Sequence, residues 1–192
     1  QEAETLSVLA SSKSRMKRYI CDMVDQIIVD GNFHLILMPK LGGPLHKHMT
    51  HGRKGRLPAT VTRGYAAEIV CALRFIHSQW CIHRDLKASN ILLDEFGHIS
   101  LSDFGSAKLL LPDDEMKASS KVMFDAIGNM IPTIRERGPM AQHYDELPRS
   151  RTLTGTPDYI SPEMFALEDT FGSEEVVCGY SFAVDWWAFG VL

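Results

Sequence analysis

The most regular hydrophobic pattern in the chain predicts a long helix from Pro58 to Ser78. Its apolar residues return every three or four positions, which is the spacing of one face of an α-helix. The residues on this face are Val61, Tyr65, Ile69, Leu73 and Ile76. Pro58 suits the first helical turn, where the amide hydrogen that proline lacks would have no partner in any case.

Two pairs of short apolar runs predict β-hairpins. The runs Ile20–Val29 and Phe33–Leu37 are separated by Asp30-Gly31-Asn32, and an Asp-Gly pair between apolar runs is a strong hairpin signal. The runs Ile91–Leu93 and Ile99–Leu101 are joined by a short turn and predict a second, smaller hairpin.

The remaining segments have weaker patterns. Leu6 and Leu9 predict the end of an amphipathic helix, and we interpret the basic stretch Ser11–Arg18 as a loop. Between Leu109 and Arg151 there is no sustained period. A stretch this long is usually functional or disordered, and a surface loop is a simpler interpretation than a docking element. The apolar run 185–192 resembles a helix that stops without a cap, so we expect the sequence to be a fragment.

Composition narrows the class of protein. A chain of 192 residues with 45% hydrophobic and 23% charged residues is typical of one globular domain. Its net charge of -4 gives no reason to expect nucleic acid as a partner, and no apolar run approaches the roughly 20 residues that span a bilayer. The four cysteines form no Cys-x-x-Cys pair, so we expect free thiols in a reducing compartment. This indicates the cytoplasm, with the nucleus as the alternative.

Some residues have a structural and a functional interpretation. His46, His48 and His51 match no strong zinc spacing, so a solvated loop or helix face is favoured over a metal site. We expect Trp186 and Trp187 to be core residues rather than a stacking platform. We interpret Cys81 as a small buried hydrophobic residue.

The segment His83-Arg84-Asp85-Leu86-Lys87-Ala88-Ser89-Asn90 contains the most informative chemistry. Transfer of a phosphoryl group to a hydroxyl needs a carboxylate that orients the hydroxyl, a positive charge and oxygen ligands for Mg²⁺. Asp85, Lys87 and Asn90 supply these three functions within one loop. Asp103-Phe104-Gly105 follows the second hairpin, where Asp103 offers a further metal ligand and Gly105 permits a sharp turn. Taken alone, these residues could also be simple turn formers.

Together the two motifs resemble the catalytic loop and magnesium loop of protein kinases. Further along, Gly155-Thr156-Pro157-Asp158-Tyr159-Ile160-Ser161-Pro162-Glu163 resembles the loop of that family that positions the substrate, with Ser161 in place of an alanine. The run 185–190, Asp-Trp-Trp-Ala-Phe-Gly, resembles the start of the central large-lobe helix, whose aspartate braces the catalytic loop. The chain is most similar to the AGC group of serine/threonine protein kinases.

This resemblance implies an α+β, two-lobed fold in truncated form. Residues 1–37 would be a remnant of the β-rich small lobe, residues 38–44 the hinge, and residues 45–192 a mainly helical large lobe. An extended activation segment would cover residues 103–163.

The resemblance also implies a reaction and its cofactors. The protein would transfer the γ-phosphoryl group of ATP to serine or threonine hydroxyls of protein substrates, with Mg²⁺ as the second cofactor. Asp85 would orient the hydroxyl, Lys87 would stabilise developing charge, and Asn90 and Asp103 would hold the metal. The residues that it places around the nucleotide are Leu37 as gatekeeper, the Met38 carbonyl, the Lys40 amide, Leu92 and Asp103.

Regulatory residues follow from the same resemblance. Thr152 matches the phosphorylated threonine of the AGC activation segment, which implies an upstream activating kinase. A phosphate adds nearly two negative charges and three acceptor oxygens, and Arg84 is its expected partner. Glu2 is expected to pair with the ATP-binding lysine of the small lobe, and Glu4 is the alternative.

The chain also departs from the family pattern. It contains neither the glycine-rich phosphate loop nor the lysine of the third strand, so we expect the fragment alone to be weak or inactive. Glu163 is expected to lack its usual partner, and Val184–Leu192 to expose apolar surface. Pro44 and Ser89 stand where AGC kinases that prefer basic substrates have acids, so a preference for arginine is not expected. A pseudokinase scaffold is the alternative function, whereas the loop 155–163 disfavours a small-molecule kinase.

Overall fold

The computed structural model describes residues 1–30, 32–51, 57–110, 149–167 and 179–192. Its helices and strands are α1 (Glu2–Ser11), β1 (Met23–Val29), β2 (Asn32–Leu37), β3 (Gly43–Pro44), α2 (Leu45–His51), α3 (Ala59–Ser78), β4 (Cys81–Ile82), β5 (Ile91–Leu93), β6 (Ile99–Leu101), β7 (Lys108–Leu109), α6 (Pro162–Phe165) and α7 (Ala183–Val191). Short 3-10 turns occur at Arg15–Tyr19, Phe104–Ser106 and Pro157–Tyr159.

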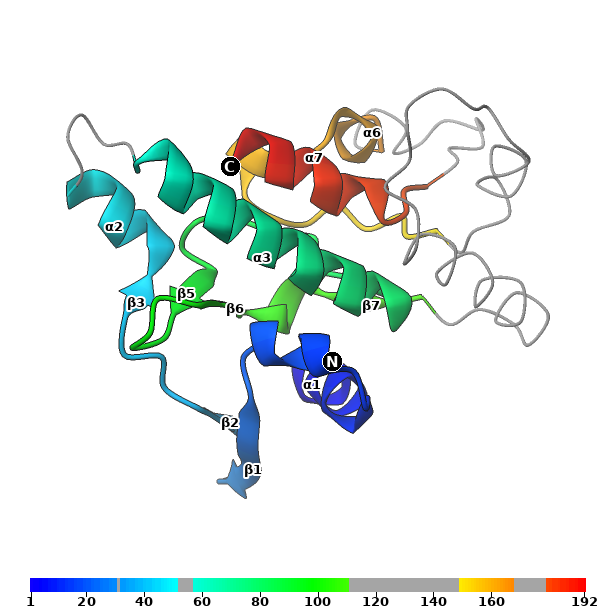
Figure 1. The fold of residues 1–192 in the computed structure, drawn as a ribbon. Coiled ribbons are helices and arrows are strands. Elements are labelled where there is room, and N and C mark those ends of the chain that lie inside the picture. The colour runs from blue at the N-terminus through cyan, green and yellow to red at the C-terminus, as the bar shows by residue number, and fades with distance from the viewer. Residues whose placement is uncertain (31, 52–56, 111–148, 168–178) are drawn as a thin grey trace.

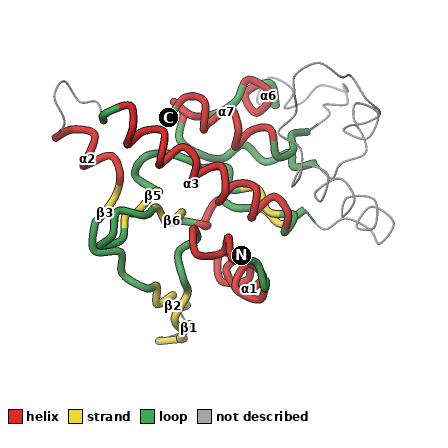
Figure 2. Tube along the Cα trace, in the orientation of Figure 1, coloured by secondary structure: helices red, strands yellow, loops and turns green. Residues whose placement is uncertain are grey.

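The long helix α3 crosses the middle of the molecule (Figure 1). Helices α6 and α7 lie on one side of it, and α1 with the hairpin β1–β2 lies on the other (Figure 2). The strands form three small antiparallel sheets, with the orders β1-β2, β3-β5-β6 and β4-β7. The expected α+β fold is therefore present, and a mainly helical part is joined to a small β-rich part.

Two hydrophobic clusters hold these elements together. The larger one joins Leu6 and Leu9 of α1 to Leu73 and Ile76 of α3, and it reaches as far as Ala188 of α7. The smaller one joins β4 and the end of the segment after β7 to residues 164–167 and 180–184. Its members are Ile82, Leu110, Met164, Leu167, Tyr180, Phe182 and Val184. The loop between β4 and β5 runs from one cluster to the other, so both cores fix its position.

The predicted long helix and both hairpins are confirmed, with small corrections. Pro58 is the N-cap of α3 rather than part of its first turn. Val61 is 38% exposed, so the buried face of the helix begins further along, at Ile69. The strand β1 begins at Met23 rather than at Ile20, because Ile20 forms a bridge with Leu101 of β6 instead of pairing within the hairpin.

Two other predictions were wrong. The stretch Ser11–Arg18 is not only loop, since a 3-10 turn begins at Arg15 after Ser14 accepts a hydrogen bond from the Met16 amide. Trp186 and Trp187 are 37% and 47% exposed rather than core residues. Consecutive residues on a helix point about 100° apart, and the buried face of α7 is taken by Val184, Asp185 and Ala188.

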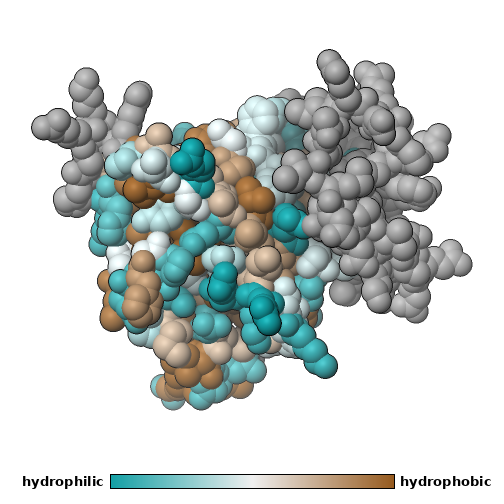
Figure 3. All heavy atoms as spheres, viewed as in Figure 1, coloured by the Kyte–Doolittle hydropathy of each residue, from teal (hydrophilic) through white to brown (hydrophobic). Residues whose placement is uncertain are grey.

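The hairpin β1–β2 exposes a patch of aliphatic side chains, seen as brown atoms at the lower end of the molecule in Figure 3. Its exposed residues are Val24, Ile27, Ile28, Val29 and Ile36. None of the described helices is both long and apolar enough to cross a membrane. The region from 111 to 148, which holds most of the predicted irregular stretch, lies outside the described residues.

Candidate active site

The loop 83–90 is held at both ends by strands. It leaves β4, which pairs with β7, and it enters β5, which pairs with β6. The Asn90 carbonyl accepts hydrogen bonds from the Ser102 amide at 2.8 Å and from the Ser102 hydroxyl at 3.0 Å. The residue before Asp103 is therefore fixed to the last residue of the loop, which brings the two sequence motifs side by side.

Asp185 anchors the other end of this loop from the first turn of α7. Its side chain is fully buried. Oδ1 accepts the Arg84 amide at 2.8 Å, and Oδ2 accepts the His83 amide at 2.9 Å and His77 Nε2 at 2.8 Å. Burial raises the pKa of Asp185, but its bonds to His77 and to the loop outweigh this, so the pKa lies below its ordinary value. The predicted bracing of the loop by Asp185 is confirmed.

His83 is buried in its neutral form. Its Nε2 lies 3.0 Å from the Ser102 carbonyl and its Nδ1 accepts the Asp85 amide at 3.3 Å, which assigns the ring hydrogen to Nε2. The ring packs edge-on against Phe104, with 4.9 Å between the ring centroids. Burial lowers the pKa of His83, and this effect exceeds the opposing influence of Asp185 and the Ser102 carbonyl.

We expect the His83 ring to make stability depend on pH. Because the pKa of His83 is lower in the folded state, the unfolded state takes up a proton first as the pH falls below about 6.5. The free energy of unfolding should therefore fall below this pH, by at most about 1.4 kcal/mol per pH unit. Urea unfolding between pH 7.5 and 5 would measure this, with His83→Gln showing a shallower slope.

His98 is the matched control for this prediction. The Glu68 carboxylate raises the pKa of His98, with Nδ1 and Oε1 2.6 Å apart. A raised pKa stabilises the folded state as the pH falls. His98→Gln should therefore make the loss of stability steeper, and an identical slope in wild type and His83→Gln would contradict the prediction.

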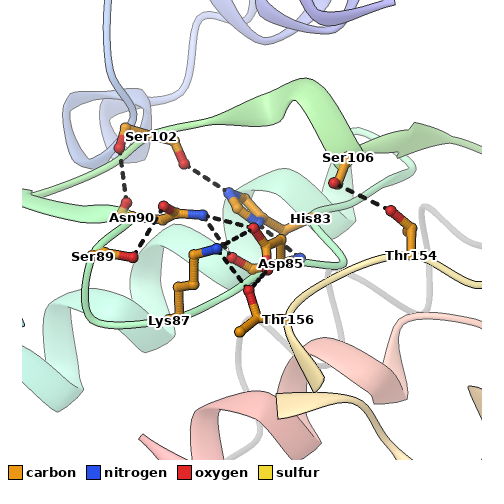
Figure 4. Close-up of polar contacts among 9 residues, drawn as sticks. All are labelled: His83, Asp85, Lys87, Ser89, Asn90, Ser102, Ser106, Thr154 and Thr156. Carbon is orange, nitrogen blue, oxygen red and sulfur yellow. Dashed lines mark hydrogen bonds and ion pairs between the residues drawn. The ribbon is translucent and has the colours of Figure 1, made fainter. Parts of the chain in front are cut away.

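Four side chains converge in the centre of the site (Figure 4). Lys87 Nζ lies 2.8 Å from Asp85 Oδ2 and donates to the Thr156 hydroxyl at 2.6 Å. The Thr156 hydroxyl in turn donates to Asp85 Oδ1 at 2.6 Å. Asn90 Nδ2 donates to the Asp85 backbone carbonyl at 2.9 Å and to Oδ2 at 3.1 Å. The three predicted catalytic residues are therefore together, and Thr156 joins them.

These contacts leave room for one more hydrogen bond to Asp85. A carboxylate offers about four lone-pair positions, and Thr156, Lys87 and Asn90 use three of them. Burial raises the pKa of Asp85, but the bonds from Lys87 and Thr156 lower it by more, so the group stays ionised at neutral pH. The remaining position on Oδ1 can accept the hydrogen of an incoming hydroxyl.

Thr156 reaches the loop because Gly155 precedes it. Gly155 has a φ of +112°, and a Cβ built there would lie 2.5 Å from the Arg84 carbonyl. Only glycine allows such an approach of two backbones. The sequence motif indicated the glycine and the threonine, but the bridge between Asp85 and Lys87 appears only in the fold.

Asp103 adopts the left-handed conformation itself, with a φ of +62°. The prediction that Gly105 makes the sharp turn was therefore wrong, because Asp tolerates this conformation better than most residues with a side chain. The Asp103 carboxylate is exposed. Asn90 Nδ2 is used by Asp85, which leaves Asn90 Oδ1 as a free oxygen apart from a long contact of 3.4 Å from Ser89. An amide oxygen and a carboxylate fit a hard cation such as Mg²⁺.

Of the residues predicted around the nucleotide, Leu37 ends β2, Met38 and Lys40 follow that strand, and Leu92 lies on β5. Leu37 is half-buried against the larger core cluster. The Met38 amide donates to the Asp22 carbonyl at 2.9 Å, and the Met38 carbonyl has a weak thiol contact of 3.9 Å from Cys21. Lys40 Nζ lies 3.9 Å from Asp22 Oδ2.

Leu92 is half-buried, and its neighbours Ile91 and Leu93 are buried in the larger cluster. Side chains alternate along a strand, so Leu92 faces away from that core. That it lies against a nucleotide stays a prediction.

Glu2 and Glu4 are clearly distinguished. Glu2 Oε1 accepts the Phe104 amide at 3.2 Å, whereas Glu4 is exposed. The structure thus places Glu2, and not Glu4, beside the segment that carries Asp103.

Arg84 and Thr152 are not in side-chain contact. Arg84 Nε donates to the Ser106 carbonyl at 2.6 Å, and its terminal nitrogens donate to Ser150, Tyr180 and Ala107. The Thr152 side chain is exposed, and only its backbone carbonyl joins this network, through the Tyr180 hydroxyl. Sequence reasoning missed Ser150 and Tyr180, because no local pattern shows that they meet Arg84.

Other predicted features lie outside the site. Glu163 is exposed on α6. Cys81 is fully buried, as predicted. His46 and His48 are exposed on α2, and no group of three potential metal-binding side chains occurs among the described residues.

The chain is similar in sequence to known protein kinases. Residues 3–126 match the family model described as the protein kinase domain. Over 174 residues, 91% of the chain, the sequence is 31% identical to "Ribosomal protein S6 kinase beta" of Caenorhabditis elegans. It is 34% identical over 164 residues, 85% of the chain, to the human "cAMP-dependent protein kinase catalytic subunit PRKX". It is 38% identical over 152 residues, 79% of the chain, to "Atypical protein kinase C" of Drosophila melanogaster.

The chain spans only part of each relative. It covers 24% of the first, 32% of the second and 18% of the third. These relatives are of the AGC type, which confirms the resemblance that the motifs indicated.

Proposed function

The chain belongs to the protein kinase family, and from this premise we propose that the protein transfers the γ-phosphoryl group of ATP to serine or threonine hydroxyls of other proteins. The observation that carries the proposal is the ionised Asp85, which is held by Lys87, Thr156 and Asn90 with one acceptor position left. This is the arrangement that aligns a hydroxyl for attack on a phosphorus atom.

Each residue would have a distinct task in the transfer. Asp85 Oδ1 orients the substrate hydroxyl and accepts its proton. Lys87, 2.8 Å from Asp85, contributes positive charge where negative charge develops on the moving phosphoryl group. Mg²⁺ held by Asn90 and Asp103 would neutralise the ATP phosphates when it is bound.

The choice of serine and threonine rests on Lys87 and Thr156. The bond between their side chains, at 2.6 Å, ties the loop 155–159 directly to the catalytic loop. The relatives named above are themselves named as kinases, including two described as protein kinases. Protein substrates, ATP and Mg²⁺ are therefore part of the proposal. A cytoplasmic location, with the nucleus as the alternative, is proposed separately and rests only on the expected free thiols.

A direct assay tests this function. The full-length protein would be incubated with Mg²⁺ and labelled ATP and with three peptide libraries, each with a fixed central serine, threonine or tyrosine. Transfer to the serine and threonine libraries is expected. Transfer to tyrosine alone would contradict the substrate class, and nucleotide binding without any transfer would favour a scaffold.

We also expect phosphorylation of Thr152 to raise activity. Its exposed side chain is accessible, and its carbonyl already contacts the Tyr180 hydroxyl that binds Arg84. A phosphate there would place charge near this guanidinium. The full-length protein with stoichiometric phosphate at Thr152 should have a kcat several times that of Thr152→Ala. Equal kcat values for the two forms would exclude this role.

A further inference from the structure

Arg84 has a backbone conformation that arginine rarely adopts. Its φ is +69°, in the left-handed region. Such a conformation persists only where the surrounding structure determines it fully. The Arg84 amide is held by Asp185 at 2.8 Å, and the side chain is buried, at 9% relative exposure. The next residue is Asp85, so the orientation of Arg84 directly sets the backbone that carries the carboxylate.

The Arg84 guanidinium is held by neutral acceptors. Two of these are the carbonyls of Ser106 and Ala107. The other two are hydroxyls, from Ser150 at 3.2 Å and from Tyr180 at 3.0 Å, and both accept from the same terminal nitrogen. A guanidinium has five donors in a rigid plane, so four partners fix both its position and its plane.

The Tyr180 hydroxyl both accepts and donates a hydrogen bond. It accepts from Arg84, and its single hydrogen is donated to the Thr152 carbonyl. The side chain is 1% exposed and packs in the smaller hydrophobic cluster. Water therefore cannot easily reach the hydroxyl and replace either hydrogen bond.

The backbone fixes this tyrosine relative to the segment that it touches. Ser150 and Tyr180 form an isolated antiparallel bridge, and each amide donates to the other residue's carbonyl at 2.8 Å. Ser150 and Tyr180 thus reach Arg84 as one unit. They connect the segment 149–156 to the residue before Asp85.

From this geometry we propose that Tyr180 is a positioning residue for phosphoryl transfer, whose hydroxyl joins the Thr152 carbonyl to the Arg84 guanidinium and so holds Asp85 in its productive orientation. The inference rests on the proposed function. It adds a contact that holds the catalytic loop without a phosphate on Thr152. The segment around Thr152 acts on the catalytic loop through this hydroxyl even when Thr152 carries no phosphate.

Tyr180→Phe in the full-length protein tests the proposal, because it retains the ring and removes only the hydroxyl. We expect kcat to fall about tenfold, which is the scale of one hydrogen bond to a charged group. The KM for ATP should stay unchanged, because none of the residues placed around the nucleotide contacts Tyr180 in the bonds described above.

Tyr19→Phe is a matched control. The Tyr19 hydroxyl also accepts from an arginine, Arg18, at 3.0 Å, and Tyr19 is also buried, at 8% relative exposure, but it lies in the 3-10 turn after α1. Removal of the Tyr19 hydroxyl should leave kcat unchanged. Equal kcat values for folded wild type and Tyr180→Phe would overturn the proposal, as would equal losses in the two tyrosine variants.

A second comparison separates positioning from packing. If Tyr180 acts through Arg84, then Tyr180→Phe should reduce kcat by less than twofold when it is added to Arg84→Lys. An undiminished tenfold loss in that background would show that the hydroxyl acts elsewhere. Ser150→Ala should give a smaller loss in the same direction as Tyr180→Phe, because it removes the other hydroxyl bound to the same nitrogen.

Amide hydrogen exchange tests the same idea without any assay of activity. The Arg84 amide and the Asn90 amide, which donates to the Lys87 carbonyl at 3.0 Å, should exchange faster in Tyr180→Phe but not in Tyr19→Phe. If wild type shows no phosphoryl transfer, the proposed function fails, and this measurement still decides the role of Tyr180. Unchanged exchange at both amides would overturn it.

Discussion

Asp85→Asn is expected to lower kcat of the full-length protein about 10²–10⁴-fold, the range usually lost with a general base. The asparagine side chain has nearly the same shape, so Thr156 and Lys87 stay close to it. It has no negative charge, however, and it cannot take the proton of an attacking hydroxyl. One of its two terminal atoms becomes an N–H donor, which faces the donors of Lys87, Asn90 or Thr156.

The loss should appear in kcat rather than in the affinity for ATP. The Asp85 carboxylate is bonded to Lys87, Thr156 and Asn90, whereas four of the five residues placed around the nucleotide, Leu37, Met38, Lys40 and Leu92, take no part in these bonds. Initial rates of transfer to a serine peptide would give kcat and KM, and a nucleotide-binding measurement would be made in parallel. ATP binding in Asp85→Asn should match that of wild type.

Asp25→Asn is a suitable control for this measurement, because Asp25 is an exposed carboxylate on β1 whose Oδ1 accepts the neighbouring Gln26 amide. Its activity should equal that of wild type. If Asp85→Asn kept at least half of the wild-type kcat, the assignment of Asp85, and with it the proposed mechanism, would be wrong.

Asp185→Ala is expected to destabilise the fold by about 3–5 kcal/mol, the usual cost of removing one partner from a buried charged network. Three donors lose their acceptor together: the amides of His83 and Arg84 and the His77 ring nitrogen. All three are buried, and Asp185 itself has no exposure to solvent. Water cannot replace the carboxylate without opening the contact between α7 and α3.

The same change should also release the strained backbone of Arg84, with its φ of +69°. Activity should therefore fall even at temperatures where the variant remains folded. Urea unfolding at pH 7 would measure the change in free energy, and the transfer assay at low temperature would measure the remaining kcat.

Asp22→Ala is the control for this second prediction. Asp22 is 62% exposed and lies 3.9 Å from Lys40, and exposed ion pairs contribute little. We expect the free energy of unfolding to change by less than about 1 kcal/mol. A loss below this value in Asp185→Ala as well would show that the carboxylate does not anchor the loop.

The amino-acid sequence by itself determined the local elements and the chemistry within one loop. The helix α3 was predictable because its apolar positions repeat at the helical period, and both hairpins because turn residues separate apolar runs. Asp85, Lys87 and Asn90 were identifiable as a group because they lie within six consecutive residues of the chain. A short loop brings its own side chains together whatever surrounds it.

The tertiary structure alone decided which distant residues complete the site. Asp185 meets Arg84 across 101 residues and Tyr180 meets it across 96, and no local pattern contains such a contact. The fold also exposed Trp186 and placed the left-handed turn at Asp103 rather than at Gly105. Burial and hydrogen bonding between separate elements set these features, because a side chain's surroundings depend on packing and not on its neighbours in sequence.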